Sequence, residues 1–104
     1  MMLDLEPTAI FCCNDLMAMG AVNACQRMGR RVPQDISVIG YDNTALSQYT
    51  APKLTTIDQN MGDLGRAAAR LMLKQIEEDV TENVMLANTV VERETTGFRV
   101  EENE

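Results

Sequence analysis

The sequence predicts an α/β fold, a three-layer arrangement around a parallel sheet in which strands and helices alternate. Two short apolar runs, Ala9 to Cys13 and Ile36 to Gly40, enclose a segment whose apolar residues recur at helical spacing. The runs are too brief for helices and lack polar alternation, which is typical of strands buried on both faces of a parallel sheet. A helix that crosses between two such strands makes them parallel neighbours with a right-handed connection.

The helix between these strands is predicted to begin at Asp15, as its N-cap, and to end near Gly29. One apolar face of this helix suits packing on the sheet. A second face carries Leu16 and Met19 together with Asn23. Because two large apolar residues gather there, this face is a candidate for association with another chain, unless a neighbouring loop covers it.

Shorter patterns predict the remaining elements. A polar loop spans residues 43–52, and Leu54 to Ile57 resumes a β-like run. Asn60 is predicted to begin a second, amphipathic helix, with Asp63 at the third helical position as in a capping box. A last strand is predicted over Val84 to Val91, where apolar residues occupy both faces.

Polar side chains follow the first two predicted strands where each strand ends. Asn14 follows the first strand and Asp42 follows the second. In open α/β sheets, ligands bind beyond the carboxyl ends of the strands. One amide and one carboxylate at that edge suit a polyhydroxylated or amide-bearing small molecule. The alternative is that both residues only cap the elements that follow, because Asn and Asp lead the rankings for helix caps and turns.

Composition narrows the classes of function. The 104 residues suit a single domain, and the net charge of −7 argues against direct contact with nucleic acid, whose phosphates require a basic face. No signal peptide is visible, and no apolar run approaches the roughly 20 residues that a membrane span needs. Three cysteines without any histidine predict neither a disulfide framework nor a metal site. We therefore expect reduced thiols, buried on both faces of the first strand at Cys12 and Cys13, and a cytoplasmic location.

Enzymatic activity is not expected. The sequence has no G-x-G-x-x-G after a strand and no phosphate-binding G-x-x-x-x-G-K, and a hydrolase triad would lack its usual histidine. Four aspartates lie near strand ends, so their number alone does not exclude a glycosidase-like pair of carboxylates. Nothing in the sequence fixes the separation of any two of them. These residues are Asp15, Asp35, Asp42 and Asp58.

Four phrases carry a more specific signal. They read PTAIFCCNDLMAMGAV, RRVPQDISVIGYDN, PKLTTIDQNMGDLGRAAARLML and VVERETT. In order and spacing, over most of residues 7–97, they closely resemble the effector-binding core of the LacI/GalR family of transcriptional regulators. The resemblance implies a two-lobed, periplasmic-binding-protein-like core (type I) whose cleft holds a sugar, nucleoside or purine effector, without any cofactor.

Within that resemblance, three residues match positions that contact or border the effector. They are the asparagine of the N-D motif, Asn14, the aspartate of the G-Y-D motif, Asp42, and Gln59 after the LTTI phrase. The resemblance also implies that residues 1–58 belong to the C-terminal lobe, that 59–91 belong mainly to the N-terminal lobe, and that 92–104 form the return crossing and a disordered acidic tail.

The family dimerises through the C-terminal lobe, which implies a homodimer. The expected interface comprises the spare helix face and the loop that follows the second strand. Its residues are Leu16, Met19, Asn23, Leu46 and Tyr49.

The chain corresponds to only the last third of such a regulator, so we expect it to contact DNA only through an N-terminal headpiece that these 104 residues do not contain. The alternative is the corresponding part of a periplasmic-type sugar-binding transport protein, which shares the fold. Free thiols and the V-P-x-D-I-S-V phrase favour the regulator.

Overall fold

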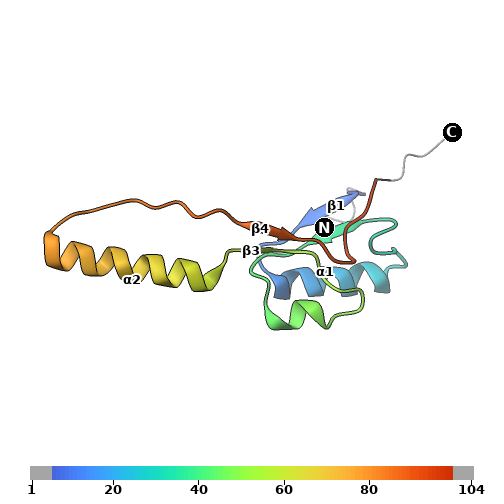
Figure 1. Cartoon of the computed structure of the whole chain (residues 1–104). Coiled ribbons are helices and arrows are strands. Elements are labelled where there is room, and N and C mark those ends of the chain that lie inside the picture. The colour runs from blue at the N-terminus through green and yellow to red at the C-terminus, as the bar shows by residue number, and fades with distance from the viewer. Residues whose placement is uncertain (1–5, 100–104) are drawn as a thin grey trace.

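The computed structural model describes residues 6–99, which form a small packed body and an arm that extends from it (Figure 1). We use "arm" for residues 61–88. The described chain measures 64 × 28 × 23 Å along its principal axes. Its elements are β1 (Ala9–Phe11), α1 (Asp15–Arg27), β2 (Ser37–Ile39), the 3₁₀ helix η2 (Ala45–Gln48), β3 (Thr56–Asp58), α2 (Met61–Glu78) and β4 (Thr89–Val91).

The strand–helix–strand unit of the body confirms the predicted topology. β1 and β2 are parallel, with Ala9 opposite Ser37 and Phe11 opposite Ile39. A single parallel bridge from Ile39 to Thr55 extends the pairing toward β3. Each strand is shorter than predicted, because the ends of the apolar runs form connections and only three residues in each pair as a ladder.

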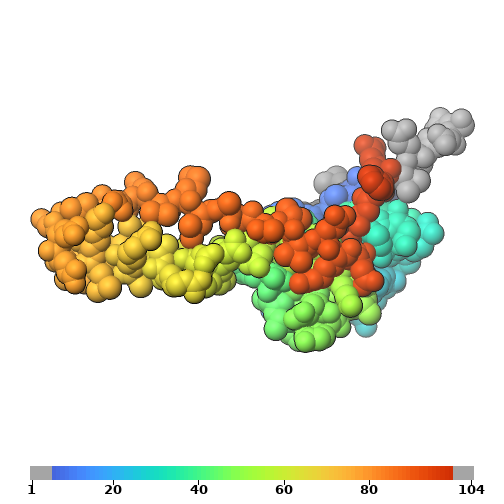
Figure 2. All heavy atoms as spheres, in the orientation of Figure 1, coloured from blue at the N-terminus to red at the C-terminus, as the bar shows by residue number. Residues whose placement is uncertain are grey.

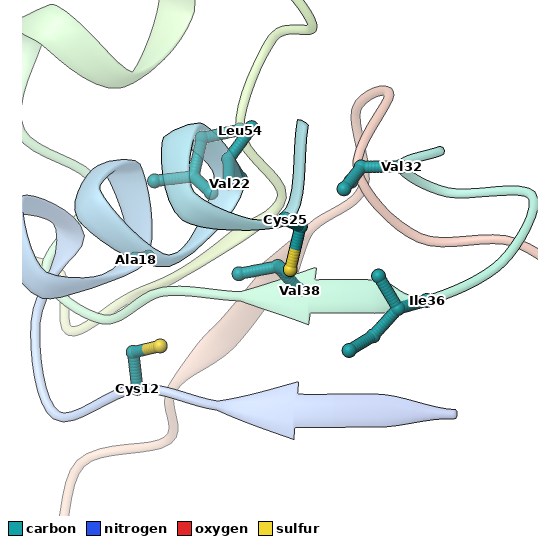
Figure 3. Close-up of a cluster of buried hydrophobic side chains, with 8 residues drawn as sticks. All are labelled: Cys12, Ala18, Val22, Cys25, Val32, Ile36, Val38 and Leu54. Carbon is teal, nitrogen blue, oxygen red and sulfur yellow. The ribbon is translucent and has the colours of Figure 1, made fainter. Parts of the chain in front are cut away.

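The core of the body lies between α1 and the β1–β2 sheet (Figure 3). Apolar side chains of α1 meet those of β2 and its flanking segments, and all of them are at most 9% exposed. The cluster comprises Cys12, Ala18, Val22, Cys25, Val32, Ile36, Val38 and Leu54. Burial raises the pKa of the Cys12 and Cys25 thiols. The expectation for Cys13 is wrong, because the face of β1 away from α1 is uncovered and leaves this thiol exposed.

Gly40 marks the closest approach of the backbone inside the body. A Cβ at this position would collide with the Asp15 carboxylate, and would lie 3.0 Å from Leu54 Cδ2 and 3.2 Å from Asp15 Cα. We expect Gly40→Ala to lower the free energy of unfolding by about 1–3 kcal/mol, the usual cost of overpacking. Gly20→Ala is the matched control: its Cβ meets nothing within 4 Å, and the change should stabilise α1 by about 0.5–1 kcal/mol. Urea denaturation measures both, and equal midpoints for the two variants would contradict the packing at Gly40.

The arm consists of α2 and the segment that returns beside it to β4 (Figures 1 and 2). No residue of α2 is buried, so its predicted apolar stripe is exposed rather than packed on the body. The Lys74 ammonium and the Glu82 carboxylate join helix and return segment at 2.6 Å, and this contact holds the pKa of Glu82 below its usual range. The predicted capping box is absent: Asn60 has a φ of 54° and makes no side-chain cap, and Asp63 pairs with Arg66 instead.

The last strand is much shorter than predicted. Only Thr89–Val91 pairs, and it runs antiparallel to β3 with Thr56 opposite Val91. Residues 80–88 run beside α2 (Figure 1), whose backbone groups are already bonded within the helix and cannot form a ladder. The acidic tail expected over 101–104 lies outside the described residues. Among residues 6–99, no helix combines the length and the apolar character needed to cross a membrane.

Candidate functional site

The carboxyl ends of β1 and β2 lie side by side and bring Asn14 and Asp42 to one edge of the sheet. The backbone N–H of Asp15 donates to the carbonyl of Tyr41 at 3.1 Å, which joins the two segments next to these residues. Asn14 and Asp42 therefore follow neighbouring strands at the same edge of the sheet. We call this region, where Asn14, Asp42 and Gln59 lie, the carboxyl edge.

Asn14 is also the N-cap of α1, one residue before the predicted cap. Its Oδ1 accepts a hydrogen bond from the backbone N–H of Met17 at 2.8 Å. Asn14 has the extended backbone of a cap (φ −156°), whereas Asp15 is already helical. Among residues 6–99, no partner engages the Nδ2 of Asn14, so the cap uses only one end of the side-chain amide.

Gln59 lies against Asp42 at the carboxyl edge. The Nε2 of Gln59 donates to the Oδ1 of Asp42, and the backbone N–H of Asp42 donates to the carbonyl of Ile57 at 2.9 Å. Asp42 and Asn43 have φ values of 105° and 52°, in the region that L-residues rarely adopt. Such backbone costs of order 1–3 kcal/mol and persists where surrounding contacts enforce it, commonly at functional sites.

Asp15 is the fully buried carboxylate beneath this edge. Its Oδ2 accepts from the backbone N–H of Thr44 at 2.6 Å and from the Thr44 hydroxyl at 2.9 Å, and its Oδ1 accepts from the Thr56 hydroxyl at 2.5 Å. The carboxylate therefore joins the start of α1 to the loop after β2 and to β3. The sequence predicted Asp15 only as a helix cap or as one of four aspartates that could form a carboxylate pair. Its actual partners could not be predicted, because they lie 29 and 41 residues away.

A second polar network lies beside the first. The Nη2 of Arg93 donates to Asn43 Oδ1 at 2.8 Å, and the Nδ2 of Asn43 donates to Asp58 Oδ2 at 3.2 Å. The Nη1 of Arg93 donates to the Ser47 hydroxyl at 2.7 Å and to the carbonyl of Leu54 at 2.9 Å. Arg93 lies in the VVERETT phrase, in a polar turn after the last predicted strand, but nothing in the sequence assigned it a role at this site.

The chemistry of the carboxyl edge is that of hydrogen bonding. It offers the amide donor of Asn14, which no residue within 6–99 engages, a carboxylate on Asp42, and the carboxamide of Gln59 beside it. Neighbouring acceptors and donors suit the hydroxyl and amide groups of a small ligand. A hollow of about 520 Å³ lies elsewhere, at the opposite end of the strands, where it is lined by Thr8, Ser37 and other residues.

The residues of the predicted association face are largely uncovered. Leu16 on α1 is 76% exposed, and Leu46 and Tyr49 on and after η2 are 64% and 76% exposed. Asn23 is exposed as well, whereas Met19 is partly buried against the core. A groove of about 250 Å³ runs past Met19 and Asn23 on the side of residues 50–52.

Comparison with known proteins gives consistent matches. Residues 1–96 match the model of the periplasmic binding protein-like domain. The "HTH-type transcriptional repressor PurR" of Pasteurella multocida (strain Pm70) is 48% identical over 83 residues, which are 80% of this chain and 25% of that protein. A lac repressor dimer bound to operator and the anti-inducer ONPF superposes with a TM-score of 0.83 at 40% identity, over 89% of this chain and 33% of that one.

A complex of the transcriptional regulator CelR with cellobiose superposes with a TM-score of 0.80 at 34% identity, over 89% of this chain and 30% of that one. The chain thus spans about a quarter of the length of the PurR repressor that it matches.

Proposed function

The chain belongs to the periplasmic binding protein-like domain family, within the LacI/GalR regulators, and on this premise we propose that it binds the small-molecule effector of a LacI-type transcriptional regulator. The observation that carries the proposal is the hydrogen bond between Gln59 and Asp42 at the carboxyl edge, next to the strand end that Asn14 follows. The matched relatives are transcriptional repressors and regulators, which favours this function over transport.

We propose a sugar, nucleoside or purine as the effector. A pair of carboxylate and carboxamide groups can accept from and donate to the hydroxyls of a sugar or the ring and exocyclic groups of a purine. The structure of the regulator CelR, which is 34% identical to this chain, contains cellobiose, and this supports a sugar as the effector.

Calorimetric titration tests this function. Ribose, lactose, cellobiose, a set of nucleosides and the purine bases would each be titrated into the full chain. We expect one class to give a saturable heat, with an affinity that Asp42→Ala lowers. A folded chain that binds no member of the panel would contradict the proposal.

We propose the division into lobes that the resemblance implies, with residues 1–58 in one lobe and 59–91 mainly in the other. The separation of the arm from the body supports it, since α2 buries no residue and β3 and β4 lie at the junction (Figure 1). The segment from residue 92 then returns to the first lobe, where the backbone N–H of Glu94 donates to the carbonyl of Lys53 at 2.9 Å.

We propose that the protein is a cytoplasmic homodimer that associates through the exposed faces of α1 and η2. The acidic charge of −7 supports placing DNA contacts outside these 104 residues. The exposure of Leu16, Leu46 and Tyr49 supports the location of the interface.

Met19→Glu tests this interface. A carboxylate inserted into an apolar contact loses its hydration without gaining a partner, so we expect the dimer to dissociate, with a dimer Kd at least about tenfold higher, equivalent to about 1.4 kcal/mol. Sedimentation velocity over a range of concentrations measures the change. Leu73→Glu, on the exposed face of the arm, is the control. If Met19→Glu sediments as wild type does, the interface lies elsewhere.

A further inference from the structure

Asn43 lies between a group that can only donate hydrogen bonds and a group that can only accept them. The Arg93 guanidinium contacts its Oδ1 at 2.8 Å, and the Asp58 carboxylate contacts its Nδ2 at 3.2 Å. A guanidinium has no acceptor, and an ionised carboxylate has no donor. A flipped amide would therefore set donor against donor and acceptor against acceptor, so the orientation of Asn43 is fixed by its neighbours.

This chain of contacts runs beside the hydrogen bond between Asp42 and Gln59. Asn43 follows Asp42 in the chain, and Asp58 precedes Gln59, so the two cross-links join the same two segments. Asp58 is itself held, because its Oδ1 accepts from the backbone N–H of Asn60 at 2.7 Å.

The backbone of the loop needs such support. Both Asp42 and Asn43 have positive φ, which L-residues adopt at a cost unless contacts enforce it. The backbone N–H of Asn43 donates to the Thr56 hydroxyl at 3.2 Å, and the side chain adds the contacts to Asp58 and Arg93. Arg93 is anchored independently by the carbonyl of Leu54.

We propose that Asn43 and Asp58, oriented by Arg93, are positioning residues that set the separation of Asp42 and Gln59 at the effector site. None of them needs to touch the effector. The role in binding rests on the proposed function, whereas the effect on the Asp42–Gln59 contact does not.

An exchange of the two side-chain types tests the proposal. Asn43→Asp sets two carboxylates 3.2 Å apart, and Asp58→Asn leaves one acceptor oxygen for two donors. In the double variant Asn43→Asp/Asp58→Asn, the new carboxylate accepts from Arg93 and from the new amide, whose oxygen still accepts from Asn60. Every donor then has an acceptor again.

The readout is the hydrogen exchange of the Gln59 side-chain amide, followed by NMR in the full chain without ligand. We expect each single variant to accelerate this exchange by about tenfold, as the loss of one net hydrogen bond implies, and the double variant to return it to within about twofold of wild type. Asp63→Asn, on the exposed first turn of α2, is the matched control and should leave Gln59 unchanged.

The outcomes separate this inference from the proposed function. Single variants that melt earlier but leave Gln59 exchange unchanged would overturn the positioning role, and so would a double variant that fails to restore it. If Gln59 responds as expected but no sugar, nucleoside or purine of the calorimetric panel binds, the positioning role stands and the proposed function fails. If both single variants and the double variant bind the ligand as tightly as wild type does, the role of these residues in binding is overturned.

Discussion

Asp42→Ala is expected to weaken effector binding by about 10- to 100-fold, which corresponds to the roughly 1.5–3 kcal/mol of a hydrogen bond to a charged group. Asp42 supplies the carboxylate at the end of β2, and its loss also releases the Nε2 of Gln59 from its partner. Calorimetry on the ligand identified from the panel measures the change. Asp79→Ala is the control, since Asp79 also has a positive φ (52°) but follows α2 in the arm.

Asn14 separates binding from helix capping. Asn14→Ala removes both the amide donor and the oxygen that caps α1, whereas Asn14→Ser keeps a capping oxygen. We expect both variants to bind about tenfold more weakly, and only the alanine variant to lose about 1 kcal/mol of helix stability. Wild-type affinity in the variants of both Asn14 and Asp42 would exclude this site.

The largest effect on stability is expected for Asp15→Ala. The change leaves one backbone N–H and two hydroxyls without their buried acceptor, and each unsatisfied donor costs about 1–3 kcal/mol. We expect the free energy of unfolding to fall by about 3 kcal/mol or more, measured by urea denaturation.

Asp63→Ala is the matched control for that change. Asp63 is also in the first turn of a helix, but its side chain is 64% exposed and pairs only with Arg66. Exposed ion pairs of this kind contribute about 0–1 kcal/mol, so the control should be close to wild type. Equal losses in the two variants would show that Asp15 does not join the segments of the body.

Local patterns were sufficient to predict the strand–helix–strand unit of the body. The unbroken apolar runs and the helical spacing between them predicted the pair β1 and β2 with α1 crossing between them, because each signal lies within a few consecutive residues. The same patterns gave too long a last strand. Residues 84–88 have the composition of a strand, but pairing depends on a neighbouring ladder, which composition does not encode.

The candidate site was predictable in part. The positions of Asn14 and Asp42 followed from the parallel topology, and the resemblance added Gln59. Asn14 does cap α1, as the alternative interpretation expected, but the cap uses only its Oδ1 and not its amide nitrogen. Arg93 and Asn43 could not be paired from sequence, because 50 residues separate them and the two phrases that contain them indicate no contact between them.

The most direct test of the effector site is NMR mapping of the bound ligand on the uniformly ¹⁵N-labelled chain. During titration with the sugar, nucleoside or purine that binds, saturable shift changes are expected at Asn14, Asp42 and the Gln59 side-chain amide. Saturable changes at Thr8 and Ser37, at the opposite end of the strands, with the carboxyl edge unaffected, would contradict the account.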